Sequence, residues 1–414
     1  QDDRLNPLEV TEEAFMDMVM KKPVSIAKAL YSSFTGLSPL LASEICHRSS
    51  IDGDMPVDSL DDDGKKHLFN NLTWIADDVK NHTYRPNIIF RGKEPIDFSC
   101  VELTQFSDYE AKNFDSISQV LEEYYASKNV YTRIRQKSVD LRKIVSTALD
   151  RNRKKYQLQE KQLKDTEKRD KYKVYGELIH TYGYGLEEGA KKLEALNYYT
   201  NEMITIPLDS QLDAKGNAQK YFDRYNKLKR TYEALIKLTE ETKTEIEHLE
   251  SISTALDIAL TEDDLVQIKE ELIEFGYIKR KKTDKKARIK SKPFHYRSSD
   301  GYDIYVGKNN YQNDELTFKF ATGNDWWFHA KGTPGSHVIV KSNNEELPDR
   351  VFEEAGMLAG YYSKGREDEK VEIDYLQKKN VKKPNGAAPG FVVYYTNYSL
   401  TIHPDISGLT LVSD

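Results

Sequence analysis

Cysteine is scarce in this chain, which contains only Cys46 and Cys100 among 414 residues. Two cysteines so far apart fit neither a disulfide framework nor the spacing of a zinc site. No apolar run approaches the ~20 residues needed to cross a membrane, and no signal peptide is visible. We therefore expect neither a disulfide-rich nor a membrane-spanning protein, and a reduced, cytoplasmic setting is compatible with the sequence.

Recognisable catalytic motifs are also missing. The sequence contains no Walker A loop, no GxSxG elbow and no dinucleotide-binding fingerprint. Carboxylates are abundant but show no distinctive pairing, and His329 and His337 have no third ligand at a metal-binding spacing. We expect a protein that is not an enzyme and that needs no cofactor or metal.

Charge, by contrast, is abundant and unevenly distributed. Charged residues make up 31% of the chain and hydrophobic residues 38%, which indicates long solvated helices. Residues 279–292 include nine basic residues and one acidic residue, a net charge of +8, so the rest carries −15. Such a run is typical either of a mobile linker or of a phosphate-binding segment. The phosphate-contact candidates in this run are Lys279, Arg280, Lys281, Lys282, Lys285 and Lys286.

The region 1–54 shows the pattern of a helix-hairpin-helix. A helix is expected over Pro23–Ser33, and a second begins after Ser38, a natural N-cap followed by proline. Gly36 is the pivot of the turn. Because amides at such a helix N-terminus can hold a phosphate, Gly36 and Ser38 are further phosphate-contact candidates. A purely structural helical hairpin is the alternative.

The next two regions differ sharply in length and polarity. Residues 55–112 predict a small α/β unit, with a helix near 61–81 and short strands around 87–90 and 96–103. Residues 113–276 are polar and helical. In the return arm an apolar or threonine side chain recurs every seven residues, which is a heptad pattern. These positions are Leu228, Leu235, Thr242, Leu249 and Leu256.

A weaker stripe runs along the earlier arm, from Phe114 through Ile134 and Val145 to Leu163. Gly183, Gly185, Gly189 and Pro207 fall between the two arms, so the chain must turn there and return. We expect an antiparallel coiled-coil hairpin whose longer arm measures roughly 90 Å if some 60 residues are unbroken. Such a rod can link two distant contact points on a large partner.

The segment 324–338 mixes aromatic residues, histidines and a Pro-Gly pair between two apolar runs. It predicts two strands joined by a tight turn, with Pro334 fixing φ and Gly335 free to take a positive φ. Aromatic side chains clustered there can stack on unpaired bases while Lys and His reach phosphates or ribose. The alternative is a structural hairpin with core tryptophans and hydrogen-bonded histidines. The RNA-binding candidates are Asp325, Trp327, His329, Lys331, Pro334, Gly335, Ser336, His337, Lys382 and Lys383.

Three ordered blocks are similar to the NFACT family. They are Asn217 to Lys229 in the return arm, Gly307 to Thr317 before the strand pair, and Val371 to Val392 after it. The resemblance implies a multidomain α+β fold. Its parts are an N-terminal region containing a helix-hairpin-helix, a long antiparallel coiled-coil hairpin, a basic linker over 277–292 and an NFACT-R-like RNA-binding domain over 293–414.

The resemblance implies a ribosome quality-control role. Members of the family bind large ribosomal subunits with stalled peptidyl-tRNA and recruit tRNA for C-terminal tailing of the nascent chain. The Asp-Arg motif implicated in tRNA recruitment belongs to a more N-terminal region, and no equivalent can be placed here. Because the sequence begins at Gln1 rather than methionine, we expect it to be truncated at its N-terminus.

Some Gram-positive relatives suggest an alternative function as a cell-surface adhesin that binds fibronectin or fibrinogen. The sequence shows no cell-wall sorting motif and no repeat array to favour this role. An acidic coiled coil could nevertheless expose a lateral binding surface, and one molecule could serve both purposes. The alternative implies a surface-exposed fraction beside a cytoplasmic one.

Overall fold

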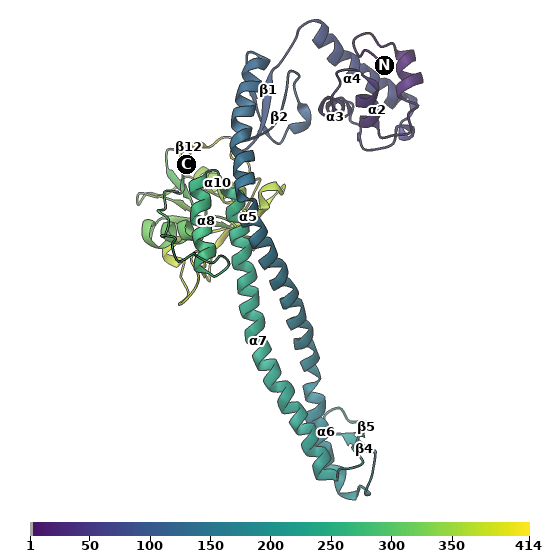
Figure 1. Ribbon diagram of the computed structural model, residues 1–414, viewed down its shortest axis with the longest axis vertical. Helices are drawn as coiled ribbons and strands as arrows, with labels where there is room; N and C mark the ends of the chain where they lie inside the picture. Colours follow the sequence, from purple (N-terminus) through teal and green to yellow (C-terminus); the bar gives the residue numbers. More distant parts are fainter. Residues whose placement is uncertain (1–2) are drawn as a thin grey trace.

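The computed structural model describes residues 3–414 and shows an elongated molecule built around a helical rod (Figure 1). An N-terminal helical unit lies beyond one end of the rod, and the C-terminal domain packs against its side near that end. A small hairpin lies at the opposite end. Within residues 3–414, no helix combines the length and apolar character needed to cross a membrane.

The N-terminal unit packs short helices around one apolar core. Ser38 caps α3, since its Oγ accepts a hydrogen bond from the Leu41 amide at 3.2 Å, and Gly36 has a φ of 78°. Both features lie where the sequence predicts them. The helices are α1 (Glu12–Ala14), a π-helical turn (Phe15–Val19), α2 (Ile26–Ser33), α3 (Pro39–Arg48), a 3-10 turn (Val57–Ser59) and α4 (Asp62–Lys80).

A three-stranded antiparallel sheet connects this unit to the rod. Its strands are β1 (Asn87–Arg91), β2 (Glu94–Ser99) and β3 (Glu110–Asn113), in the order β2-β1-β3, and a 3-10 turn covers Thr104–Phe106. The sequence predicted two strands and missed β3, whose side chains are all exposed and give no apolar signal.

The rod is an antiparallel pair of long helices, as predicted. The first arm comprises α5 (Ile117–Asp165), a 3-10 turn (Thr166–Lys168) and α6 (Arg169–Tyr182), and the second is α7 (Ala214–Ile258). The heptad residues Leu235, Thr242, Leu249 and Leu256 are buried, whereas Leu228 is partly exposed. In the stripe of the first arm, Ile134, Leu141, Val145 and Ala148 are buried, whereas Ile117 and Leu121 remain 38% exposed.

Neither arm is a single helix of some 60 residues. The 45 residues of α7 span about 68 Å. The chain then reverses, and α8 (Glu262–Glu274) begins at a capping box formed by Thr261 and Asp264. Helical geometry ends at the far turn as well, after a 3-10 turn (Gly183–Gly185).

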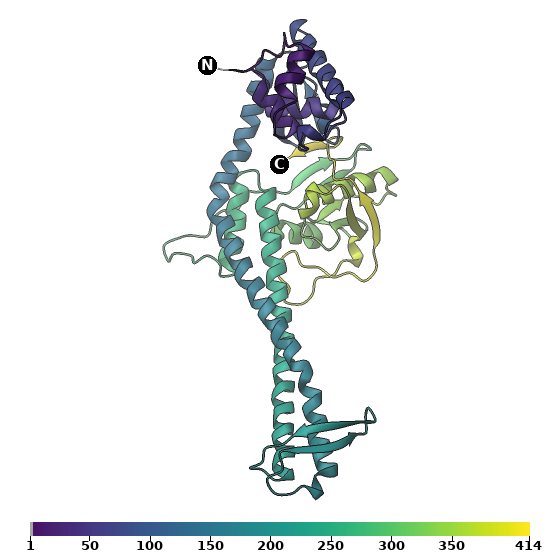
Figure 2. The same cartoon turned by 90° about the vertical axis from the view of Figure 1, so that its right-hand side faces the viewer.

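A β-hairpin closes the far end of the rod, where the sequence predicted only a turn. Strands β4 (Lys192–Asn197) and β5 (Glu202–Pro207) pair with each other and lie against the ends of α6 and α7 (Figure 2). Leu193, Ala195 and Ile206 bury one face of the hairpin, while Tyr199 and Met203 are 63% and 67% exposed.

The C-terminal domain contains a seven-stranded antiparallel sheet in the order β11-β10-β8-β9-β7-β6-β12. One face packs under α10, and the other face carries a smaller core around Trp327 and Ile339. Its elements are β6 (Phe294–Arg297), β7 (Asp303–Val306), α9 (Asn310–Glu315), a π-helical turn (Leu316–Phe320), β8 (Trp326–Ala330), β9 (Val338–Val340), α10 (Asp349–Tyr361), a 3-10 turn (Lys364–Glu367), β10 (Val371–Gln377), a 3-10 turn (Lys378–Asn380), β11 (Tyr398–Ile402) and β12 (Thr410–Ser413).

Candidate nucleic-acid interface

Strands β8 and β9 place the predicted aromatic and histidine residues on one face of the sheet. Trp326 pairs with Val340, Trp327 with Ile339 and Phe328 with Val338. Because side chains alternate along a strand, Trp327 and His329 share a face, while Phe328 points into the core under α10. The sheet thus separates the face that carries Trp327 and His329 from the core face under α10.

The connection between these strands is longer than the predicted tight turn. It runs from Lys331 to His337 and is held by the neighbouring segment, because the Ser336 amide donates to the carbonyl of Tyr362 at 2.9 Å. Gly332, with a φ of 63°, takes the positive φ that was expected of Gly335. Gly335 instead lies so close to Ser363 that a Cβ would be 2.9 Å from the Ser363 Cβ.

Three rings form the wall of an open cleft of about 500 Å³. The rings of Trp327 and His329 stack with centroids 5.6 Å apart, and His337 lies edge-on at 5.1 Å from Trp327 and 5.7 Å from His329. Tyr394 packs against Trp327 from the other side, at 5.3 Å. Pro334, Gly335 and Phe391 complete this part of the lining.

Both imidazoles are neutral at pH 7. Burial lowers the pKa of His329, and burial together with the nearby His329 lowers the pKa of His337 well below its ordinary value. A hydrogen bond of 2.7 Å joins Nδ1 of His337 to the Thr317 hydroxyl, and the His337 amide donates to Asn313 at 3.1 Å. Neutral imidazoles suit contacts with bases or ribose hydroxyls better than contacts with phosphate. Of the two roles expected for these histidines, the contact with ribose is therefore favoured over the contact with phosphate.

Two buried polar groups in the strand pair and its connection have no hydrogen-bond partner among the described residues, and one of them belongs to Ser336, a predicted site residue that does not line the cleft. They are the indole nitrogen of Trp327 and the hydroxyl of Ser336. Trp327 and Ser336 are each 1% exposed. Buried donors without partners are rare in folded proteins, and an ordered water or a ligand usually satisfies them.

The rod forms the opposite side of the cleft and makes it acidic there. Glu247, Glu250 and Ser251 of α7 face the strand residues across the opening. Glu250 is paired with Arg153 at 3.0 Å, whereas no ion pair of Glu247 occurs within the part of the chain described. A deep phosphate contact is therefore disfavoured, and among the described residues no lysine or arginine lines the cleft.

The remaining candidates of the C-terminal domain are dispersed. Lys331 is exposed and paired with Glu372 at 2.9 Å, and Lys383 is paired with Asp314. Lys382 is exposed and donates to the carbonyl of Lys379 at 3.1 Å. Asp325 does not line the cleft. It is buried and accepts hydrogen bonds from the amides of Thr322 and Ser342 and from Lys341, so it holds the start of β8.

The phosphate-contact candidates lie elsewhere in the molecule. Gly36 and Ser38 are exposed in the N-terminal unit, with the Ser38 hydroxyl occupied by its own helix cap. In the basic run, Arg280 is partly buried and paired with Glu270. Its neighbours are exposed and form no ion pair within residues 3–414; they are Lys279, Lys281, Lys282, Lys285 and Lys286.

A polar network joins the C-terminal domain to the rod and was not recognised from the sequence. Asn309 and Gln312 donate to Gln267 of α8 at 2.8 and 2.9 Å, and Asn310 donates to Glu271 at 2.7 Å. The run of amides at the start of α9 was the available signal, because buried amides need several partners. This network fixes the cleft between the two domains.

Comparison with known proteins agrees with this architecture. Residues 1–291 match the NFACT N-terminal and middle domains, and residues 292–395 match the NFACT protein RNA binding domain. The Rqc2 homolog RqcH of Bacillus subtilis (strain 168) is 34% identical over 411 residues, which cover 97% of this chain and 69% of that protein. The Rqc2 homolog RqcH of Streptococcus suis (strain 05ZYH33) is 36% identical over 402 residues, which cover 97% of this chain and 67% of that protein.

A solved structure shares the fold of about two thirds of this chain. It is described as the C-terminal part of the fibronectin/fibrinogen-binding protein from Streptococcus suis, and it superimposes with a TM-score of 0.53 at 39% identity. The alignment covers 66% of this chain and 96% of that structure. Domain matches, relatives and fold lead to the same conclusion: the chain belongs to the NFACT family.

Proposed function

We propose that this chain is an RNA-binding factor of ribosome-associated quality control. It would bind large ribosomal subunits that carry stalled peptidyl-tRNA and take part in recruiting tRNA for C-terminal tailing. The match to an RNA-binding domain and the similarity to Rqc2 homologs support this role. The structural observation that carries it is the cleft in which Trp327, His329 and His337 meet.

The cleft suits an unpaired nucleotide better than a duplex. An unpaired base can stack on aromatic and imidazole rings, and neutral imidazoles can exchange hydrogen bonds with its edge or with the 2′-hydroxyl. Lys331 lies at the same end of the strand pair, where it can meet the backbone of the bound strand. The acidic side formed by Glu247 and Glu250 would repel further phosphates and favour a single inserted nucleotide.

No chemical step is assigned to the chain itself in this proposal. Peptide-bond formation would remain the reaction of the ribosome, while this protein positions RNA and stabilises the complex. The site of action would be the cytoplasm, where stalled subunits occur.

The test compares a cleft variant with a matched control. The cleft variant combines His329→Ala, Lys331→Ala and His337→Gln, where glutamine keeps a hydrogen-bonding group near Thr317. The control combines His403→Ala with Lys319→Ala, both exposed and outside the lining of the cleft. We expect the cleft variant to bind large subunits and single-stranded RNA at least tenfold more weakly at an unchanged melting temperature. Equal affinities for parent and cleft variant would remove the site.

A second candidate function is binding of fibronectin or fibrinogen at the cell surface. The observation favouring it is the solved relative, which is described as a fibronectin/fibrinogen-binding protein. Surface plasmon resonance with purified fibronectin, run beside co-sedimentation with large subunits, separates the two functions. Saturable fibronectin binding by the cleft variant, with subunit binding lost, would show two independent surfaces.

A further inference from the structure

A second pocket lies where three parts of the chain meet. Its volume is about 220 Å³, and its lining comes from the β1–β2 turn, the two arms of the rod and the segment that follows α10. This is smaller than the ~300 Å³ at which pockets for drug-sized ligands begin. The space therefore suits a compact group rather than a folded element of RNA.

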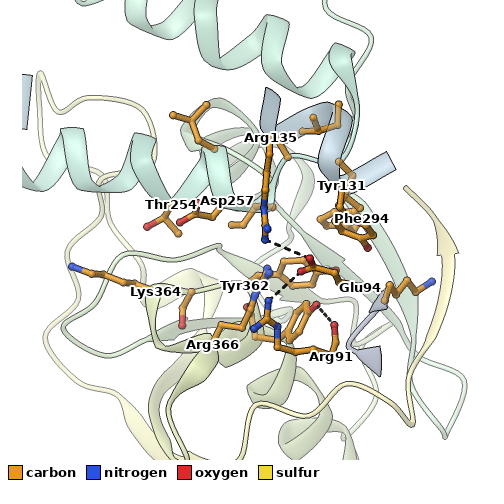
Figure 3. A pocket seen from close by; sticks show the side chains of 18 of the residues that line it. Arg91, Glu94, Tyr131, Arg135, Thr254, Asp257, Phe294, Tyr362, Lys364 and Arg366 are labelled. Atoms are coloured by element: carbon orange, nitrogen blue, oxygen red, sulfur yellow. Dashed lines mark hydrogen bonds and ion pairs between the residues drawn. The ribbon is translucent and has the colours of Figure 1, made fainter. Parts of the chain in front are cut away.

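Cations outnumber carboxylates around this space. Figure 3 shows the guanidinium groups of Arg91 and Arg135 joined to the carboxylate of Glu94, which is 5% exposed. Glu94 is paired with Arg91 at 3.1 Å and Arg135 at 3.4 Å, and Lys128 adds a third contact at 3.3 Å. One carboxylate thus faces several positive charges in a partly enclosed site.

The other carboxylates in the lining do not cancel this excess. Glu367 pairs with Arg91, and Asp257 pairs with Arg142 at 2.6 Å. Six cationic side chains line the pocket against three carboxylates. In the part of the chain described, neither Lys364 nor Arg366 forms an ion pair, so both retain unneutralised charge beside the pocket.

Two hydrogen-bond donors point to a missing acceptor. Nε of Arg91 is buried without a hydrogen-bond partner among residues 3–414. Tyr131 also lines the pocket, and burial raises the pKa of its hydroxyl, which keeps its proton. An acceptor with several oxygens and negative charge would satisfy both donors.

Packing holds this arrangement in place before any ligand binds. The Arg366 guanidinium lies 4.2 Å from the Tyr361 ring centroid, and its Nε donates to the Tyr361 carbonyl at 2.8 Å. The Tyr361 hydroxyl in turn donates to the carbonyl of Arg91 at 3.2 Å. These contacts leave the terminal nitrogens of Arg366 available for a ligand.

We propose that this junction pocket binds a phosphoryl group, held by Arg91, Arg135, Lys364 and Arg366. Guanidinium groups match phosphate oxygens in geometry and charge, which neutral or cationic ligands do not. The group could belong to a free nucleotide or to an RNA strand, since both present the same oxygens. Because three parts of the chain supply the contacts, a bound phosphoryl group would also hold the β1–β2 turn against the C-terminal domain.

The experiment measures binding of pyrophosphate to the whole chain by calorimetry and ³¹P NMR. The test variant is Arg135→Gln with Lys364→Gln, and the control is Lys143→Gln with Lys370→Gln. Each pair of substitutions removes one positive charge from α5 and one from the C-terminal domain. Lys143 and Lys370, however, are exposed outside the pocket. We expect the test variant to weaken pyrophosphate binding at least tenfold and the control to change it less than twofold.

Two competition arms identify the source of the group. ADP displacing pyrophosphate at equal or lower concentration would indicate a free nucleotide, and displacement only by a single-stranded RNA would indicate the backbone. Absence of pyrophosphate binding, or equal weakening in test and control variants, would overturn the proposal. The cleft variant with His329→Ala should bind pyrophosphate normally, so failure here is distinguishable from failure of the proposed function.

Discussion

The ammonium group of Lys308 lies 3.1 Å from a carboxylate oxygen of Asp264, and the two side chains are only 3% and 2% exposed. Asp264 also accepts hydrogen bonds from the Ser291 hydroxyl and from the Leu260 and Thr261 amides. Burial opposes ionisation of Asp264, but the Ser291 hydrogen bond and the charge of Lys308 together lower its pKa. The pair links α8 of the rod to the strand-rich domain.

Replacing Lys308 with Met should destabilise this junction by about 3–5 kcal/mol, because it leaves a buried carboxylate without its cation. Urea unfolding checks the value. The transition in tryptophan fluorescence can be compared with the loss of helix measured by circular dichroism. The double variant Lys308→Met, Asp264→Leu should recover part of the loss. If the single variant is as stable as the parent, the ion pair does not hold the two domains together.

Replacing Gly92 with Ala should detach the β1–β2 turn from the C-terminal domain. Gly92 has a φ of 61°, and a Cβ there would overlap the hydroxyl of Tyr361. Gly301→Ala is the matched control, because Gly301 has a φ of 88° but nothing within 4 Å of a Cβ. We expect backbone strain to lower the free energy of unfolding by about 1 kcal/mol in each variant. Only Gly92→Ala should increase hydrogen exchange at residues 87–99.

Stability should fall as the pH is lowered through about 6.5. His329 and His337 have lowered pKa values in the folded chain, so the unfolded chain takes up protons at these sites first. The stabilising contribution is complete above the unfolded pKa and is lost as the pH falls toward the folded values. Melting temperatures between pH 7 and pH 5.5 should fall less in a His337→Asn variant than in the parent. Parallel curves for the two proteins would contradict the assignment of neutral imidazoles.

The basic run offers a test through salt dependence. Replacing Lys281, Lys282, Lys285 and Lys286 with Gln should lower the slope of log K against log salt for single-stranded RNA by up to about 0.7 per lost phosphate contact. The control replaces four exposed lysines of the first arm, Lys143, Lys154, Lys161 and Lys164. An unchanged slope in the first variant would leave the run as a linker.

Shortening the rod tests whether its far end is a separate contact point. The guanidinium of Arg224 lies 4.3 Å from the Tyr172 ring centroid, so residues 173–223 can be removed and the arms joined there by a short loop. RNA binding by the C-terminal domain should be retained, while affinity for whole large subunits should fall about tenfold or more. Full subunit affinity in the shortened protein would reduce the rod to a spacer.

The sequence predicted those parts of the fold that depend on local periodicity. The heptads of α7, the capped helix after Ser38 and the alternation at Trp327 to His329 all encode structure over short distances. Family resemblance supplied the order of the domains. Together these identified the wall of the cleft.

Features that depend on distant residues were not predictable in this way. The partner of Lys308 is Asp264, and the position that needs a positive φ proved to be Gly332 because Gly335 packs on Ser363. The acidic side of the cleft comes from α7, and Glu94 meets Arg135 only after the rod and the sheet have assembled. Such contacts are set by tertiary packing, for which one sequence carries no direct pattern.

The attachment of the C-terminal domain near one end of the rod makes the whole molecule a lever. With α7 about 68 Å long, a tilt of about 5° at that end would move the β4–β5 hairpin by about 6 Å. Small rearrangements where α8 or the β1–β2 turn meets the C-terminal domain would therefore be magnified at the far end. Through this amplified displacement, a change at the buried Lys308–Asp264 ion pair would alter the contacts that the β4–β5 hairpin makes with a partner surface.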